Sequence, residues 1–166
     1  RWNKMWIVAK IKPKESSIFK EQLNKKFQNE VQFYEPKIHY QSNNSKKIKK
    51  LLGNYIFCFN EKFKNNNILS PAKYTKGLKY FLKDYKNSQK GILKFINFCQ
   101  NYEDQDGFLL EGFFKNIAIS KAKFLNGPLA NLVFDILENN KNNLTIKIRQ
   151  RKIFLKKSSN FFYLPV

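Results

Sequence analysis

The chain has 166 residues and a formal net charge of +20, and 42% of its residues are hydrophobic. This composition is sufficient to bury a core and excludes a wholly disordered protein, while the length fits one ordinary domain or two small ones. Residues 1–100 carry 22 Lys and Arg against 6 Asp and Glu, whereas residues 101–166 carry 10 against 6. So basic a field predicts a polyanionic partner. Genome composition is a competing cause, because lysine has AT-rich codons.

The sequence lacks the residues that several functional classes require. His39 is the only histidine, and Cys58 and Cys99 lie singly within apolar patterns, so we expect buried reduced thiols and no metal or cofactor. There is no Ser-His-Asp arrangement, phosphate-binding glycine loop or carboxylate pair, so we expect no enzyme. No apolar run reaches membrane-spanning length and no signal-peptide pattern opens the chain, so we expect a cytoplasmic protein without a membrane partner.

The first elements show clear hydrophobic periodicity. Residues 5–12 alternate and predict a strand, which Pro13 ends. A helix is predicted next, capped by Ser16 or Ser17. Its apolar residues are four apart and share one face: Phe19, Leu23 and Phe27.

A hairpin is predicted in the middle of the chain. Residues 31–40 are a second extended run, in which Pro36 indicates an edge strand or a bulge. Residues 41–50, QSNNSKKIKK, predict a polar hairpin tip. Residues 51–60, LLGNYIFCFN, predict the returning strand, which is apolar on both faces. Its alternating rows are Tyr55, Phe57 and Phe59 on one side and Ile56 and Cys58 on the other.

The following segments complete a β-α-β-β-β-α order. Residues 61–75 form a connection with at most a short helix, and residues 77–84 predict a fourth strand. Residues 88–101 predict a helix. Its apolar stripe has the spacing i, i+3, i+4, i+7: Ile92, Phe95, Ile96 and Cys99. This order is close to a split β-α-β, ferredoxin-like layout, an α+β fold with helices on one face of a sheet.

The last third of the chain has a different character. Residues 101–112 are acidic and predict a linker that separates a first domain, 1–100, from a second, 113–166. The second domain contains short apolar runs between turn clusters, which predict a small β-barrel. These runs are NIAIS, LVFDIL, LTIKIRQ and KIFLKK. The stretch LANLVFDILENN is also compatible with a helix.

Four motifs in order resemble the NusG family of transcription elongation factors, from about Met5 to Pro165. They are MWIVAKIKPKE, LLGNYIFCFN, YTKGLKYFL and NGPLANLVFDI. The resemblance implies a ferredoxin-like domain of the NGN type, followed by an SH3-like barrel of the KOW type. The sequence departs from the family at Gly53, where proline is usual, and at Phe134, near the glycine of the barrel motif. These departures favour a specialised RfaH-like paralogue at least as well as the general factor.

The resemblance implies a monomeric, nucleoid-associated factor that binds bacterial RNA polymerase and suppresses pausing or termination. Its contact would be the clamp helices of the largest subunit, reached by the face of the 51–60 strand that helices leave uncovered. The residues implied are Lys10, Leu52, Asn54, Tyr55 and Phe57. The alternative that Tyr55 and Phe57 belong to the core stays open.

A second surface is implied for the non-template DNA strand, where lysines would neutralise phosphate and an aromatic ring would stack on a base. Its residues are Lys12, Lys14, Lys73, Tyr74 and Lys76. Another basic group, formed by Lys46, Lys47, Lys49 and Lys50, either reaches duplex DNA or keeps the hairpin tip soluble.

The carboxy-terminal domain is implied to recruit a second partner through Leu129 and Leu132. In the family this partner is a small-subunit ribosomal protein or the termination factor Rho. The helix-compatible stretch also allows a carboxy-terminal domain that refolds, as in RfaH. The alternative function is a ribosome-associated or RNA-binding protein that uses an open sheet face and the basic surface.

Overall fold

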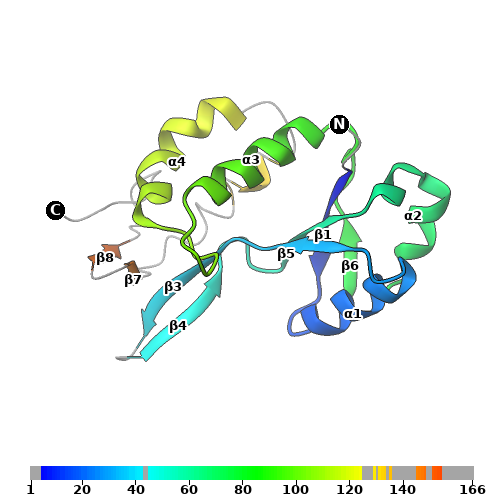
Figure 1. Ribbon diagram of the computed structural model, residues 1–166, viewed down its shortest axis with the longest axis horizontal. Helices are drawn as coiled ribbons and strands as arrows, with labels where there is room; N and C mark the ends of the chain where they lie inside the picture. Colours follow the sequence, from blue (N-terminus) through cyan, green and yellow to red (C-terminus); the bar gives the residue numbers. More distant parts are fainter. Residues whose placement is uncertain are drawn as a thin grey trace. The chain divides into compact units, whose positions relative to one another are not determined.

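The protein is an α+β chain with antiparallel strand pairs and several helices (Figure 1). The computed structural model describes residues 5–42, 45–124, 129, 131–133, 135, 145–148 and 151–154. The chain divides into two compact units. The first consists of Arg1–Glu35 and Asn54–Ile92, and the second of Pro36–Gly53 and Leu93–Val166. The predicted boundaries at residues 100 and 113 do not coincide with this division, because residues 36–53 belong to the second unit.

A four-stranded antiparallel sheet forms the centre of the first unit. Its strands are β1 (Trp6–Ile11), β2 (Gln32–Tyr34), β5 (Tyr55–Phe59) and β6 (Leu78–Phe81), in the order β2-β5-β1-β6. The strands expected within residues 5–12, 51–60 and 77–84 are therefore confirmed. The extended run 31–40 is interrupted before Pro36, and β2 is an edge strand, as proline predicted.

Three helices accompany this sheet: α1 (Ser16–Lys26), η1 (Glu61–Lys64) and α2 (Asn66–Ala72). The predicted stripe of α1 is confirmed, since Phe19, Leu23 and Phe27 are all buried. Phe27 also meets Phe63 of η1 edge to face, with ring centroids 4.9 Å apart. Asn60 and Asn65 cap η1 and α2 through their side chains.

Both faces of β5 carry apolar side chains that are removed from water. Ile56 and Cys58 belong to the core cluster, with Ile7, Ala9 and Ile11 of β1 on the same face. On the other face Phe57 is fully buried and Phe59 nearly so, whereas Tyr55 at the strand's start is only partly buried. The two-faced pattern of this strand therefore reflects burial on two sides.

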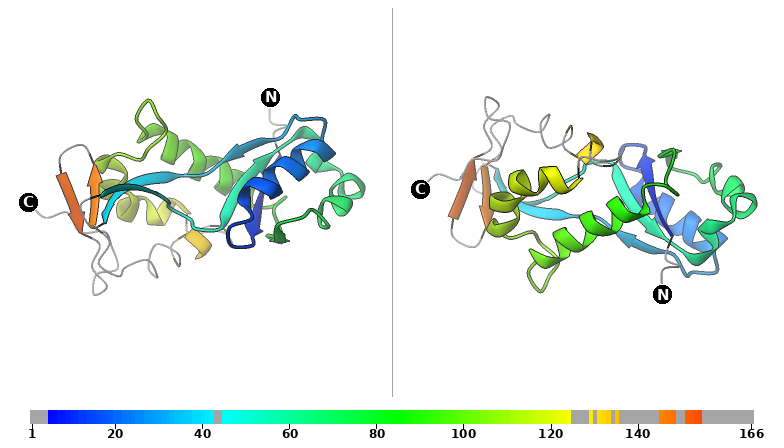
Figure 2. Two further views of the ribbon diagram at one scale, coloured as in Figure 1. Left: turned by 90° about the horizontal axis from the view of Figure 1, so that it is seen from below. Right: turned by 90° about the horizontal axis from the view of Figure 1, so that it is seen from above.

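A two-stranded hairpin opens the second unit. It is formed by β3 (Lys37–Ser42) and β4 (Ser45–Lys50), and Figures 1 and 2 show it as an extended ribbon, drawn in cyan. The prediction that residues 41–50 are a polar tip was wrong, because Ser45–Lys50 pair with β3 in a continuous register. Residues 45–50 are polar except for Ile48 and almost all exposed, so their hydropathy shows no period-two signal that would predict a strand.

Helix α3 (Gln89–Asn101) starts in the first unit and ends in the second. Its predicted stripe is confirmed, since Ile92, Phe95, Ile96 and Cys99 are buried. The acidic stretch that follows is a compact turn, although the sequence predicted a linker. One carboxylate oxygen of Asp104 accepts hydrogen bonds from the amides of Asp106 and Phe108, both at 2.9 Å. Phe108 and Leu109 are buried within this turn.

The barrel predicted for residues 113–166 is not what the described residues form. NIAIS lies in helix α4 (Glu111–Phe124), and Leu132 and Val133 of LVFDIL are also helical. Phe113 and Ile117, one turn apart in α4, are both buried, and a short apolar run does not distinguish such a helix from a strand. The final elements are β7 (Thr145–Ile148) and β8 (Arg151–Phe154), which pair antiparallel where strands were predicted.

Candidate functional site

Three polar side chains form a row across the first unit's sheet. In the ladder, Lys10 of β1 is the direct partner of both Tyr55 on β5 and Tyr80 on β6. Direct cross-strand partners share a face, so the three side chains lie together, opposite the face of Ala9 and Ile11. The Lys10 ammonium lies 4.1 Å from the centre of the Tyr55 ring, and the two phenol oxygens are 3.1 Å apart. We call Lys10, Tyr55 and Tyr80 the tyrosine row.

The tyrosine row combines apolar rings with a cation and hydroxyl groups at its surface. Burial is the largest cause, and the hydrogen bond with Tyr80 the second, of a pKa of Tyr55 that is raised to about 12. The Tyr55 phenol is therefore neutral at physiological pH. Tyr80 is 44% exposed, so a partner can reach the row from the β6 side. Amphipathic rings of this kind are enriched at protein interfaces.

The predicted polymerase-binding residues are only partly brought together. Asn54 is exposed next to Tyr55, and its carbonyl accepts a hydrogen bond from the Ile11 amide at 2.8 Å. Phe57 shares the face of Tyr55 but is fully buried, with its ring centroid 6.2 Å from that of Tyr34. Leu52 is buried and belongs to the second unit. A partner would meet Lys10, Asn54 and Tyr55 directly, and would reach Phe57 only after a rearrangement.

Sequence reasoning missed Tyr80. The strand that carries it was predicted, but the register of β6 against β1 could not be. The ladder shifts register between Lys10 and Ile11, so the partner of Lys10 does not follow from counting along either strand. The available signal was an aromatic residue at a solvent-facing strand position, which is too common to single out a site.

A second group of predicted residues lies on two adjoining turns of the first unit. The Lys12 amide donates a 2.9 Å hydrogen bond to the Gly77 carbonyl, which joins the β1–α1 turn to the α2–β6 turn. Gly77 has φ +86°, and an added Cβ would lie 2.8 Å from the Glu15 carbonyl oxygen, so the approach requires glycine. The predicted nucleic-acid-binding residues are therefore carried by neighbouring turns. We call Lys12, Lys14, Lys73, Tyr74 and Lys76 the basic turn surface.

Tyr74 of the basic turn surface is the most exposed large hydrophobic residue that the structure describes, with 86% of its area accessible. The turn that carries Tyr74 is stabilised by the buried Thr75 hydroxyl, which donates a 2.6 Å hydrogen bond to the Ala72 carbonyl. All four lysines of the surface are exposed. Lysines bind phosphate, and an exposed ring offers a stacking platform to an unpaired base.

The predicted carboxy-terminal contact residues lie in a helical segment and not on a barrel rim. Leu129 is buried and Leu132 is partly buried. In this arrangement Leu129 is not accessible to a partner, whereas Leu132 is partly accessible.

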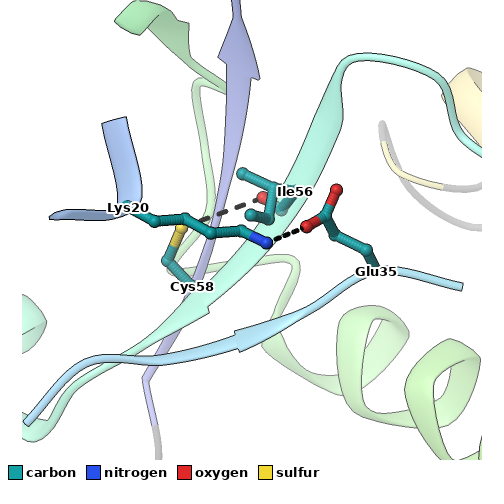
Figure 3. A network of polar contacts seen from close by, with 4 residues as sticks. All are labelled: Lys20, Glu35, Ile56 and Cys58. Carbon is teal, nitrogen blue, oxygen red and sulfur yellow. Dashed lines mark hydrogen bonds and ion pairs between the residues drawn. The ribbon is translucent and has the colours of Figure 1, made fainter. Parts of the chain in front are cut away.

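The thiols are buried, as expected. Cys58 lies in the first unit's core, with its sulfur 4.0 Å from the Ile56 carbonyl oxygen, close to an ion pair between Lys20 and Glu35 (Figure 3). Burial raises the pKa of the Cys58 thiol well above its ordinary value, so it is held as an unreactive thiol. In the described part of the chain, no group of three or more His, Cys, Asp and Glu side chains is arranged to hold a metal ion.

No protein-family model matches the chain, and no curated protein matches it significantly. Among the described residues, no helix combines the length and apolar character needed to cross a bilayer. The function therefore has to be argued from the chain's own residues.

Proposed function

We propose that this protein is a transcription elongation and antitermination factor that binds bacterial RNA polymerase through the first unit's sheet. The observation that carries the proposal is the tyrosine row, an accessible aromatic and cationic surface at the position where the sequence resembles the polymerase-binding strand of the NusG family. The proposed contact is the pair of clamp helices on the largest polymerase subunit. Aromatic anchors that become buried in a complementary groove are a common source of affinity.

The topology of the first unit supports an NGN-type, ferredoxin-like domain. With the hairpin set aside, its elements run β1-α1-β2-β5-α2-β6, and the sheet order is β2-β5-β1-β6. Each β-α-β crossover therefore skips one strand and places an antiparallel neighbour between its two strands. This arrangement is the split β-α-β layout that the resemblance implies for the polymerase-binding domain.

The basic turn surface supplies the proposed contact with the non-template DNA strand. Its lysines would neutralise phosphates and Tyr74 would stack on an unpaired base. By binding polymerase and DNA together, the factor would favour the elongating state according to its differential affinity for that state. Pausing and termination then become less frequent.

The carboxy-terminal region supports the specialised, RfaH-like form of this proposal, because residues 111–124 are helical. Recruitment of a small-subunit ribosomal protein or of Rho through Leu129 and Leu132 stays a prediction. Circular dichroism of the isolated 113–166 fragment tests the helical form. A helical spectrum supports it, and a spectrum of strands alone contradicts it.

The decisive experiment is a pull-down of bacterial core RNA polymerase with the full chain. We expect the wild type to retain polymerase and the variant Tyr55→Ala/Tyr80→Ala to bind it about 30-fold more weakly, which corresponds to a loss of about 2 kcal/mol at an interface anchor. The matched control is Tyr74→Ala, which also removes an exposed ring but leaves the tyrosine row intact. It should retain polymerase. Thermal unfolding of each variant separates lost binding from lost folding.

Failure of the wild-type chain to retain polymerase would refute the proposal. If the same chain then bound single-stranded RNA or ribosomal subunits, the alternative of a ribosome-associated or RNA-binding protein would replace it. Exposed Tyr74 among four lysines is compatible with that function as well, because stacking and phosphate contacts serve both nucleic acids.

A further inference from the structure

The β3–β4 hairpin of the second unit is strongly basic. Residues 36–53 contain no Asp or Glu but five lysines, which are Lys37, Lys46, Lys47, Lys49 and Lys50. Lys46, Lys47 and Lys50 are exposed, and the apolar Ile48 between them is also 61% exposed. We call residues 37–42 and 45–50 the basic ribbon.

The register places the lysines on both faces of the basic ribbon. Lys46 is opposite Gln41 and Lys50 is opposite Lys37, and these pairs share one face with the pair of Ile48 and His39. Lys47 and Lys49 alternate with them and therefore point to the other face. Exposed lysines therefore lie on both faces of the ribbon near its tip, although Ile38, opposite Lys49, is buried at the base. Binding to a flat anionic surface needs positive charge on one face only.

The base of the ribbon is held firmly within the second unit. The Leu51 amide donates to the Pro36 carbonyl and the Leu109 amide to the Lys37 carbonyl, at 2.8 and 2.9 Å. The His39 ring stacks on the Phe108 ring with centroids 3.6 Å apart, and the Lys37 ammonium lies 4.5 Å from the same ring. These contacts fix the start of β3 and the end of β4, so Lys46 and Lys47, near the start of β4, are presented on a preorganised element.

We propose that the basic ribbon binds duplex nucleic acid by entering a major groove. The phosphates of the two nucleic-acid strands would then flank the ribbon, one strand on each side. A B-form major groove is about 12 Å wide and admits a two-stranded β-ribbon. Lysines on both faces match the two phosphate walls of such a groove. A bilayer surface would engage one face only. Single-strand binding relies on aromatic platforms, and the exposed side chains described on the ribbon are lysine, serine and isoleucine.

This site is separate from the basic turn surface, which lies in the first unit and is proposed to take a single strand. The proposal needs no contact with polymerase, because it rests on the charge and register of the hairpin alone. Duplex binding can therefore succeed or fail independently of the function proposed above.

The test is fluorescence anisotropy of the full chain with a 30-base-pair duplex of arbitrary sequence, as a function of salt. Lys46→Gln and Lys47→Gln each remove one exposed charge, from opposite faces of the ribbon. Each lost phosphate contact lowers the slope of log affinity against log salt by about 0.9. We expect about 0.9 from each variant and about 1.8 from the pair, so the wild type loses about 12-fold more affinity than the pair between 50 and 200 mM salt.

Two matched variants complete the design. Lys83→Gln/Lys86→Gln removes two exposed lysines of the first unit and should leave the slope close to that of the wild type. Lys46→Arg/Lys47→Arg keeps both charges and should show the salt slope of the wild type. An equal loss in the Lys83/Lys86 variant would overturn the proposal, because binding would then follow net charge alone. An effect of only one of the single variants Lys46→Gln and Lys47→Gln would overturn groove binding, because only one face of the ribbon would then contact phosphate.

The occupant is tested with two further probes. If the Lys46→Gln/Lys47→Gln pair lowered binding to vesicles of phosphatidylcholine with phosphatidylserine but not to the duplex, the partner would be a membrane surface and the proposal would fail. If the pair weakened binding to an unstructured single strand as much as to the duplex, a groove would not be the site. A larger loss for the duplex than for either probe supports the proposal.

Discussion

The variant Tyr80→Phe removes a single oxygen from the tyrosine row and tests its geometry directly. The ring of residue 80 stays in place, but the 3.1 Å contact with the Tyr55 hydroxyl is lost. Burial is the largest cause of the raised pKa of Tyr55, and the Tyr80 hydrogen bond comes second. We therefore expect the pKa of Tyr55 to fall below about 12 in the variant but to stay above its ordinary value of 10.0.

The cost in stability should be small. A neutral hydrogen bond contributes about 0.5–1.5 kcal/mol, and the exposure of Tyr80 places this one near 0.5 kcal/mol. Because the pKa of Tyr55 is raised on folding, its neutral form is favoured in the native state. The resulting stabilisation is complete below about pH 10 and is lost as pH rises toward 12. In Tyr80→Phe the pH range over which this stabilisation is lost should be narrower, because the pKa of Tyr55 in the folded state is lower.

Ultraviolet titration of tyrosinate measures the effect, with Tyr55→Phe to identify the Tyr55 transition among the eight tyrosines. Tyr74→Phe is the control, because it removes a tyrosine of the same unit that lies outside the row. The Tyr55 transition should persist in it unchanged. If Tyr55 ionised at the same pH in Tyr80→Phe as in the wild type, the two hydroxyls would not be in contact, and the tyrosine row as described would be refuted.

Three more predictions concern the first unit and the thiols. Gly77→Ala should destabilise the protein by about 1–3 kcal/mol in thermal unfolding, because its φ is +86° and its Cβ would clash with the Glu15 carbonyl; an unchanged melting temperature would contradict the close approach of the two turns. Tyr74→Ala should weaken binding to single-stranded DNA by about 1–3 kcal/mol at an unchanged melting temperature, and unaltered affinity would exclude stacking. Cys58 and Cys99 should react with a thiol reagent only in denaturant, because both are buried; fast labelling of the native chain would disprove this.

Hydropathy patterns alone determined the elements whose apolar residues repeat with a clear period. The stripes of α1 and α3 and the alternation of β1 and β5 each predicted an element of the correct type. The reason is physical. In a helix or strand that packs against a core on one face, the core-facing residues recur with the period of that element's backbone. The resemblance grouped Lys12, Lys14, Lys73, Tyr74 and Lys76 on one surface, and the structure places them on two turns that a hydrogen bond joins.

Tertiary structure decided strand register, burial and pairing, which depend on contacts between elements. The register of β6 brought Tyr80 to Lys10, and the burial of Phe57 removed a predicted anchor from the surface. β4 is a strand although its sequence is polar, because its backbone bonds to β3 and needs no apolar face. NIAIS became helical because Phe113 and Ile117 are buried one turn apart, a contact that a five-residue run cannot reveal. Periodicity reports where a residue points along its own element, whereas register and packing depend on partners far away in the chain.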